Sequence, residues 1–422
     1  MARAGLLPAT LTLLAGGVLA QALPLLLGPW LARLYSPQEF GVYHLFAAVA
    51  ANLAVVACAR YEFALPLVRD EAQAVALRRL CLWLLAAVVV LCALIGVAWA
   101  LVQAQAFPLW LPAAVGALGL LSLATLWATR EQRFAALAAS RVLQHGGGAL
   151  AQAGAGLAQM GVHGLIAAPI AAAVAATAVL RLPTVAGADG RESGPPPGLR
   201  EVARRHRDFP LLNTPHAFLG ALQDTLSVAL VTAHLGAAAA GAWGLALRYL
   251  KAPATLVGGA LSQALYPRLA AGGDGATAQG RAVVRQAMLT LAALATPLVV
   301  ALWLWGPPLF AWAFGEPWRP AGELARSLAL YIGVHFVASP LGVVTLAWRA
   351  QAWALKLALV GQIAFVAALA AGLHLGGLTG AGWVVSGVTA VYFGWYFWCL
   401  ATWPTDPAPV PAAPSAAGEG AA

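Results

Sequence analysis

Long apolar stretches recur along almost the whole chain and are separated by short polar connections. Stretches of 18 or more apolar residues are long enough for an α-helix to cross a bilayer core of about 30 Å. The pattern therefore predicts an all-α integral membrane protein with about twelve transmembrane helices, six in each half of the chain. The predicted spans lie near residues 7–33, 41–67, 80–102, 109–129, 136–159, 162–182, 210–234, 241–266, 287–306, 321–347, 355–376 and 378–402.

One local pattern occurs twice, about two hundred residues apart. Residues 32–43 close one apolar span and open the next, and residues 233–243 do the same in the second half. The matching landmarks are Gly41 with Tyr61 and Pro66 downstream of it, and Gly241 with Tyr266 and Pro267 downstream of it. Two tandem membrane halves are typical of transporters whose site lies between the repeats.

Composition and charge agree with a membrane protein. Hydrophobic residues make up 61% of the chain and charged residues only 9%, which is far from the balance of soluble proteins. Arginines gather in the even-numbered connections, so the positive-inside rule predicts that these connections and both termini are cytoplasmic. The net charge of +9 is thereby explained by topology and requires no nucleic-acid partner.

A connection rich in Pro, Gly and Arg divides the chain into halves. We predict an N-terminal six-helix bundle over residues 1–182, a cytoplasmic linker over 183–208, a C-terminal six-helix bundle over 209–403 and a disordered cytoplasmic tail over 404–422. The four cysteines show no metal-ligand spacing, so we expect packed thiols, no metal site and no cofactor. These cysteines are Cys58, Cys81, Cys92 and Cys399.

Charged residues inside the predicted spans are candidates for function, because a charge near a helix centre costs roughly 2.5–3.5 kcal/mol on insertion scales. The cations are Arg60, Arg141, Arg248 and Lys251, and the acids are Glu62 and Asp224. Uncharged polar residues extend these positions into stripes at helical spacing, which predicts a water-filled cavity. The polar residues of the stripes are Gln152, Asn213, His216, Ser227 and Thr255.

Several motif residues and intramembrane charges have a structural interpretation as well as a functional one. Ser36 and Glu39, with Pro37 between them, form a capping-box pattern at the start of the second span. Arg60 and Glu62 lie near the predicted cytoplasmic interface, where a long side chain can extend to water. Asp224 is either a structural partner of one of the cations or a protonatable coupling site.

Four short motifs, in this order, carry a resemblance to a known family. They are Tyr35-Ser36-Pro37-Gln38-Glu39-Phe40-Gly41, Arg60-Tyr61-Glu62-Phe63-Ala64, Phe209-Pro210 and Ser262-Gln263-Ala264-Leu265-Tyr266-Pro267. With them the chain resembles the bacterial O-antigen and exopolysaccharide unit flippases of the multidrug/oligosaccharidyl-lipid/polysaccharide flippase superfamily. The resemblance covers roughly residues 5–400.

The resemblance implies two six-helix bundles that form a V-shaped cavity open alternately to each side of the bacterial inner membrane. It implies a substrate in which an oligosaccharide is linked through diphosphate to undecaprenol, embedded among membrane lipids. A polysaccharide polymerase complex is an implied partner. The diphosphate suits guanidinium and ammonium groups, so its predicted ligands are the four cavity cations Arg60, Arg141, Arg248 and Lys251. Among them, Arg248 and Lys251 lie three residues apart on one helix face and are favoured.

Two other functions are consistent with the same spans. A drug exporter of the same superfamily would favour acids and aromatic residues in its cavity, whereas the cavity predicted here is net basic. A membrane-embedded polymerase or ligase of polysaccharide assembly would be expected to have a sizeable periplasmic loop with arginines, whereas the odd-numbered connections are short. No covalent chemistry, and hence no enzyme activity, is expected.

The first testable prediction concerns topology. Because arginines load the even-numbered connections, a reporter fused within residues 183–208 is expected to show a cytoplasmic signal, and one fused near residues 103–108 a periplasmic signal. Alkaline phosphatase and green fluorescent protein fusions at both positions provide the measurement. A periplasmic signal from the 183–208 fusion would contradict the orientation.

Overall fold

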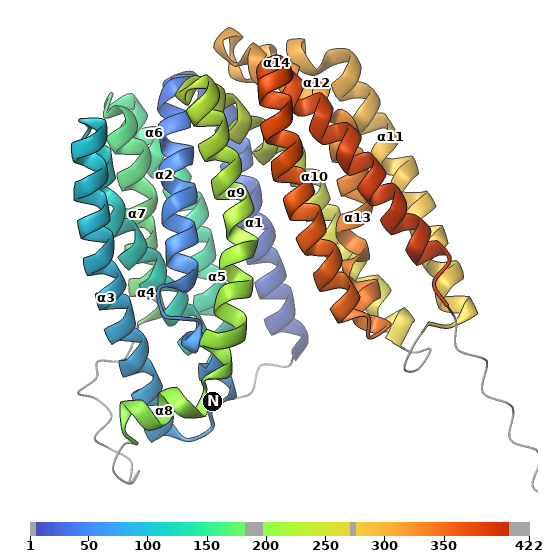
Figure 1. Ribbon diagram of the computed structural model, residues 1–422. Coiled ribbons are helices and arrows are strands. Elements are labelled where there is room, and N and C mark those ends of the chain that lie inside the picture. Colours follow the sequence, from blue (N-terminus) through green and yellow to red (C-terminus); the bar gives the residue numbers. More distant parts are fainter. Residues whose placement is uncertain (1–5, 182–196, 271–275, 405–422) are drawn as a thin grey trace, which may run out of the picture. The chain divides into compact units, whose positions relative to one another are not determined.

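The computed structural model describes residues 6–181, 197–270 and 276–404, and within them every regular element is helical (Figure 1). In chain order the elements are α1 (Leu6–Leu34), α2 (Pro37–Val56), η1 (Tyr61–Leu67), α3 (Glu71–Gln103), η2 (Phe107–Trp110), α4 (Leu111–Arg130), α5 (Phe134–Val142), η3 (Leu143–Gly147), α6 (Gly148–Leu157), α7 (Gly161–Leu180), α8 (Leu199–Arg205), η5 (Phe209–Asn213), α9 (Thr214–Leu235), α10 (Ala237–Ala270), α11 (Ala278–Phe314), η6 (Glu316–Trp318), α12 (Arg319–Ser327), α13 (Ala329–Ala347) and α14 (Gln351–Ala401).

The all-helical membrane fold is confirmed, but the count of twelve spans is not. Within the described residues, nine helices are long and apolar enough to cross a bilayer. Predicted span 136–159 is divided by the π-helical turn η3 between α5 and α6. Predicted spans 355–376 and 378–402 both fall in α14, whose helical geometry is interrupted at Gly376 and Gly377.

The second predicted span is too long. Helix α2 ends at Val56, and the residues that follow turn through Ala59 and Arg60, whose φ values of 48° and 61° are left-handed. The 3-10 helix η1 then carries the sequence that was predicted to complete the span. The run contains no helix-breaking residue before Pro66, and the charges of Arg60 and Glu62, which lie just after the end of α2, were interpreted as charges inside the span.

The predicted linker at 183–208 is partly helical. Residues 182–196 lie outside the described part of the chain, as do residues 405–422 of the predicted tail. Helix α8 follows, and its Val202 is buried in the hydrophobic core that also contains Phe46 of α2 and Leu77 of α3. The Tyr61 hydroxyl donates to the Ala203 carbonyl at 3.2 Å, and the side-chain amide of Gln73 lies 3.1 Å from Nε2 of His206.

The described chain forms two compact units that do not coincide with its two sequence halves. The first comprises Met1–Tyr249, Trp305–Arg326 and Leu369–Gly382, and the second comprises Leu250–Leu304, Ser327–Ala368 and Trp383–Ala422. Helices α10, α11 and α14 contribute residues to both units. The bundle boundaries drawn from the sequence remain a prediction.

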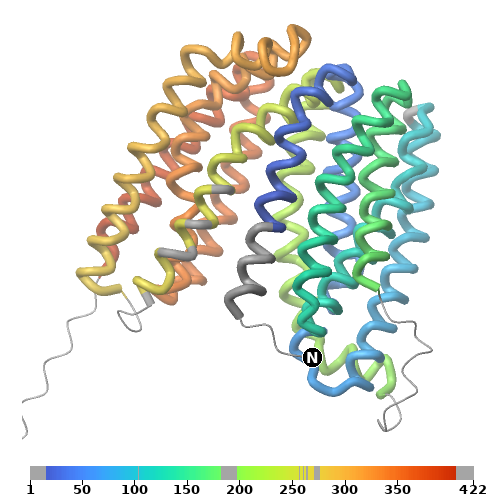
Figure 2. The backbone as a smooth tube through the Cα atoms, turned by 180° about the vertical axis from the view of Figure 1, so that it is seen from behind, coloured from blue at the N-terminus to red at the C-terminus, as the bar shows by residue number. Residues whose placement is uncertain are grey.

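The first unit contains most of the N-terminal helices. Helix α2 packs against α9, α4 and α7, and α3 packs against α4. Seen from the other side, α1 packs along the continuous helical segment formed by α5, η3 and α6 (Figure 2). Polar contacts join α2 to α9, because the Asn52 amide donates to Thr225 Oγ1 and Thr225 donates to the Ala48 carbonyl.

The capping box predicted at the start of α2 is confirmed. The backbone N–H of Glu39 donates to Ser36 Oγ at 3.2 Å, and the backbone N–H of Ser36 donates to the Glu39 carboxylate at 2.8 Å. The neighbouring Tyr35 hydroxyl donates to the Gln152 carbonyl at 2.7 Å. Burial and the nearby Glu39 carboxylate raise the pKa of Tyr35 to about 12, so this phenol stays a donor.

The two landmark glycines of the sequence repeat meet each other. A Cβ atom on Gly41 would overlap the carbonyl of Ala237, and one on Gly241 would overlap the carbonyl of Pro37. The N-terminal turns of α2 and α10 therefore cross in backbone contact, as small residues allow in membranes. The repeat does not extend to the second pair of landmarks, because Tyr61 lies in η1 whereas Tyr266 and Pro267 lie inside α10.

The second unit has its own apolar core, built by α11, α13, the later turns of α10 and the end of α14. Leu265, Leu291 and Leu341 are among its buried residues. The predicted span 321–347 is broken at Leu328, where α12 ends and α13 begins. Ser262 Oγ donates to the Pro340 carbonyl at 3.1 Å and so ties α10 to α13.

The glycine contact gives a prediction about stability. Gly241→Ala is expected to destabilise the protein by about 1–3 kcal/mol, because the new methyl group overlaps the backbone of α2. Gly220→Ala is the matched control, since a Cβ there meets nothing within 4 Å and alanine is the better helix former. Thermal unfolding midpoints of the purified proteins in detergent provide the measurement, and equal midpoints for the two variants would contradict the close crossing.

Candidate functional site

Arg248 joins three other polar or cationic residues inside the first unit. Its guanidinium donates to the Pro24 carbonyl of α1 at 3.3 Å. His44 of α2 and His145 of η3 both lie within electrostatic range of Arg248, and Arg141 of α5 lies within range of His145. We call Arg248, His44, His145 and Arg141 the basic cluster.

Pro29 creates the site on α1 at which α10 forms a hydrogen bond. Pro29 has no N–H group, so the Leu25 carbonyl one turn earlier loses its helical hydrogen bond. The Tyr249 hydroxyl donates to that carbonyl at 2.8 Å. Gly28 leaves the space for the phenol, because a Cβ there would overlap the Tyr249 oxygen. Arg248 is thereby anchored by its neighbour as well as by its own bond to α1.

His44 belongs to the cluster but was not among the residues selected from the sequence. Its ring packs against Gly244 of α10 and against the Phe40 ring, with a centroid distance of 5.9 Å to Phe40. Its Nε2 is buried and makes no hydrogen bond within the described residues. A signal was present, since His44 lies three residues after Gly41 in an otherwise uncharged part of the span.

Lys251 lies one helical turn beyond Arg248 on α10 but belongs to the second unit. There it is within electrostatic range of His335 on α13. His335 lines a cavity of about 240 Å³ within that unit. The polar residues of the cavity wall are His335, Ser339, Thr345, Tyr392 and Tyr396.

The predicted polar stripes do not all face open space. Gln152 is buried, and its amide donates to the Leu165 carbonyl of α7 at 3.0 Å. Ser227 is also buried and bonds back to the Gln223 carbonyl of its own helix. These two residues therefore stabilise helix packing, which spacing alone does not distinguish from the lining of a cavity.

The other stripe residues are exposed in the structure. Asn213 lies in the π-helical turn η5, and His216 and Asp224 follow on α9. Thr255 is exposed on α10 and bonds to the Ala252 carbonyl of the preceding turn. His145 likewise lies in a π-helical turn, a local geometry that is frequent at functional sites.

Arg60 and Glu62 were predicted inside the second span, and the structure corrects their position. Both lie after the end of α2, outside the nine apolar helices of the described chain. Arg60 stacks over the Phe63 ring, 4.1 Å from its centroid. Burial raises the pKa of Glu62, and a hydrogen bond to the backbone and the charge of Arg60 offset part of that rise.

Comparison with solved structures shows which proteins share this fold. The chain superposes on the lipid II flippase MurJ in an inward closed conformation with a TM-score of 0.68 and 8% identity, covering 92% of this chain and 89% of that one. It also superposes on a multidrug resistance MATE family transporter of the MOP superfamily, inward-facing, with a TM-score of 0.60, 15% identity, and coverage of 90% and 95%. The chain is thus a multi-pass membrane protein with the fold of these transporters.

The sequence then identifies the family. Residues 30–323 match the model of a polysaccharide biosynthesis protein family, and the chain belongs to this family. No curated protein sequence matches the chain. The resemblance drawn from the four short motifs is confirmed.

The anchoring of Arg248 gives a further prediction. Tyr249→Phe leaves the Leu25 carbonyl without a donor and is expected to cost about 1–3 kcal/mol of stability. Tyr266→Phe, on an exposed tyrosine of the same helix, is the control and is expected to be neutral. Chemical or thermal unfolding in detergent measures the difference. An unchanged midpoint for Tyr249→Phe would show that the carbonyl finds another partner.

Proposed function

We propose that this protein is a flippase that moves an undecaprenyl-diphosphate-linked oligosaccharide unit across the bacterial inner membrane, with both of its termini in the cytoplasm. The observation that carries the proposal is the basic cluster around Arg248, on helices of the first unit of a polysaccharide biosynthesis family member. A fold shared with a lipid II flippase is consistent with it.

The chemistry of the cluster suits a diphosphate. A guanidinium offers five N–H donors in a planar fork that matches phosphate oxygens. The Pro24 carbonyl takes one donor of Arg248 and orients the group. His44 and His145 add ring nitrogen atoms, and an imidazole N–H can donate a hydrogen bond to a phosphate oxygen. Lys251 follows three residues later in α10 and is proposed as a second ligand of the diphosphate.

Transport then requires no covalent change in the substrate. The sugar and the diphosphate pass through a polar environment while the polyprenyl chain remains in lipid. Alternating access in tandem-repeat transporters proceeds by movement of one bundle against another. Asp224, exposed on α9, would either carry a coupling proton or balance a cation during this movement.

A drug exporter is the alternative within the same fold, and the MATE structure is consistent with it at the level of fold alone. Cationic drugs call for acidic and aromatic ligands, whereas the cluster around Arg248 is basic. A polymerase or ligase of polysaccharide assembly would be expected to have a sizeable periplasmic loop with arginines, whereas the connections predicted to be periplasmic are short. The flippase is therefore the function that the site supports best.

The proposal predicts the effect of removing charge from α10. Replacing both Arg248 and Lys251 by Gln is expected to lower export of lipid-linked sugar at least about tenfold, which corresponds to roughly 1.4 kcal/mol. Arg248→Lys is expected to retain partial activity, because the charge remains while the fork geometry is lost. Surface polysaccharide in a strain that lacks its own flippase is the measurement, normalised to the amount of protein in the membrane.

The matched control is Arg204→Gln, which removes an exposed positive charge from α8, outside the spans. This variant is expected to export normally. Normal polymer from the Arg248 and Lys251 double variant would contradict the proposal. A selective loss of drug resistance, with no change in polymer, would favour the exporter.

A further inference from the structure

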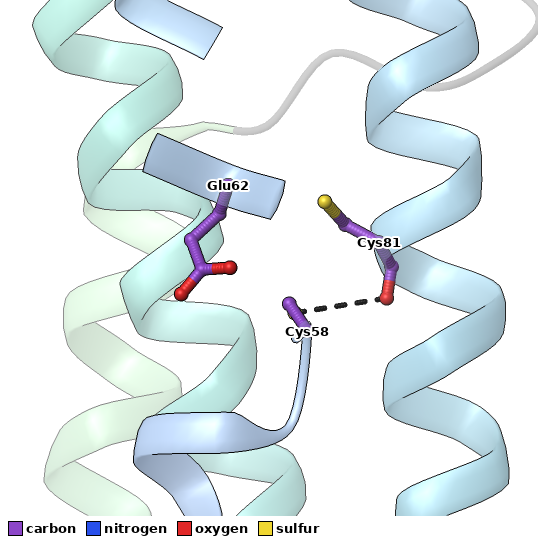
Figure 3. A group of neighbouring side chains, drawn as sticks. All are labelled: Cys58, Glu62 and Cys81. Atoms are coloured by element: carbon purple, nitrogen blue, oxygen red, sulfur yellow. Dashed lines mark hydrogen bonds between the residues drawn. The ribbon is translucent and has the colours of Figure 1, made fainter. Parts of the chain in front are cut away.

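Two cysteines and a glutamate converge beside the end of α2. Cys58 lies in the turn that follows α2, Glu62 in η1 and Cys81 in α3. Their ligand atoms, two sulfur atoms and a carboxylate oxygen, all lie within 4.8 Å of one another. Figure 3 shows the Glu62 carboxylate and the Cys81 thiol on either side of Cys58. The three residues are called the thiol–carboxylate cluster below.

The left-handed turn brings these groups together. Ala59 and Arg60, both with positive φ, reverse the chain between Cys58 and Glu62. A non-glycine residue in this conformation costs roughly 1–2 kcal/mol, so the surrounding contacts must hold the turn in place. One of them runs from Cys58 Sγ to the Cys81 carbonyl at 3.6 Å. The strained turn therefore places the side chains of Cys58 and Glu62 against that of Cys81.

The cluster is closed to water and incompletely satisfied. Cys58 and Glu62 are each 2% exposed, and Cys81 is 0% exposed. Glu62 Oε2 is buried without a hydrogen-bond partner within the described residues. A buried carboxylate without a partner is unfavourable, and a cation is one of the partners that satisfies it.

We propose that the thiol–carboxylate cluster is a binding site for one borderline-soft divalent cation of the Zn²⁺ type. Two thiolates and a carboxylate form a donor set that Zn²⁺ accepts, at about 2.3 Å for sulfur and about 2.0–2.2 Å for oxygen. A tetrahedral ion with these bond lengths holds its ligand atoms roughly 3.5–3.8 Å apart, so separations of up to 4.8 Å need to close by no more than about 1.3 Å.

Charge and access fit the same site. Each thiol that binds releases its proton to solvent, so two thiolates and a carboxylate around a divalent ion carry a net charge of minus one. Arg60 lies close enough to act on Glu62 electrostatically and balances that charge. Phe63, Pro66 and Leu67 of η1 are exposed, so a small displacement of this short surface element admits the ion.

The bound ion would join three parts of the first unit. It would link the end of α2 and the η1 helix to α3, and through the hydrogen bond of Tyr61 to Ala203 it would also hold α8. The sequence gives no warning of such a site, because Cys58 and Cys81 are separated by 22 residues and the third ligand is an acid from another element.

Metal binding to the purified full-length protein tests the site. The reduced protein in detergent is equilibrated with Zn²⁺, freed of excess metal, and assayed for bound metal by elemental analysis. Co²⁺ is then substituted, since cobalt bound to thiolate gives an intense near-ultraviolet charge-transfer band. The expected result is one ion per chain and a cobalt–thiolate band.

Variants separate this site from adventitious binding. Cys58→Ser and Cys81→Ser are each expected to lower the affinity for Zn²⁺ at least about 100-fold, because even outer-shell changes cost 10–100-fold. Glu62→Gln, which keeps both thiols, is expected to weaken binding while retaining the cobalt–thiolate band. Cys92→Ser is the matched control, since Cys92 is a buried thiol of α3 outside the cluster.

Three results would overturn the proposal. They are absence of stoichiometric metal in the folded wild-type protein, equal loss of metal in the Cys92→Ser control, and retention of full affinity in both Cys58→Ser and Cys81→Ser. Size-exclusion elution confirms that each variant is folded, and Glu62→Gln tests the site if a cysteine variant does not fold.

Discussion

Backbone contact between α2 and α10 at Gly41 and Gly241 is the constraint on which the first unit depends. Helices normally lie 8–10 Å apart, separated by their side chains, whereas here each glycine faces a carbonyl of the other helix. The close crossing brings the next turns of both helices together, so His44 packs on Gly244. Three turns of α10 beyond Ala237, Arg248 reaches α1 as a consequence. The position of the basic cluster therefore follows from the absence of a side chain at Gly41 and at Gly241.

Pro29 in α1 also determines where α10 packs, because it leaves the carbonyl oxygen of Leu25 without a hydrogen bond inside the helix. In the hydrocarbon core of a membrane, no water can donate a hydrogen bond to an unpaired carbonyl, so the donor must come from another helix. Tyr249 provides this partner at Leu25 and fixes the rotation of α10 about its axis. Arg248, the preceding residue, is directed by the same contact. The carbonyl of Leu25 and Arg248, a substrate ligand in our proposal, therefore lie close together because Tyr249 bonds to that carbonyl and directly follows Arg248 in α10.

Hydropathy predicts the helical membrane fold because the cost of polar groups in lipid acts on every residue of a span. The capping box at Ser36 was also predictable, since it depends on residues three apart. The end of α2 was not, because the left-handed residues Ala59 and Arg60 include no glycine or proline, and the charges of Arg60 and Glu62 have a functional interpretation as well as a structural one. Gln152 shows a second limit, since a polar residue at helical spacing can bond a neighbouring helix as readily as face a cavity.

The candidate site was predictable only in part for a related reason. Arg248 and Arg141 are conspicuous because a charge in a span is costly, whereas His44 is neutral in its usual state and attracts less attention. Their proximity depends on which helices pack together, and the sequence does not specify this. The thiol–carboxylate cluster illustrates the same point, because Cys58 and Cys81 meet only through the packing of η1 against α3.

Helix α3 is longer than the membrane is thick. Its 33 residues extend about 50 Å at 1.5 Å per residue, against a hydrocarbon core of about 30 Å. Its first turns, from Glu71 to Arg79, are nevertheless packed: Ala74 and Leu77 are buried, and Glu71 forms an ion pair with Arg130 at the end of α4. Helix α8 is attached to the same turns through Gln73 and His206. The charged start of α3 is therefore held by α4 and α8, so the helix exceeds the thickness of the hydrocarbon core without leaving an unsupported end.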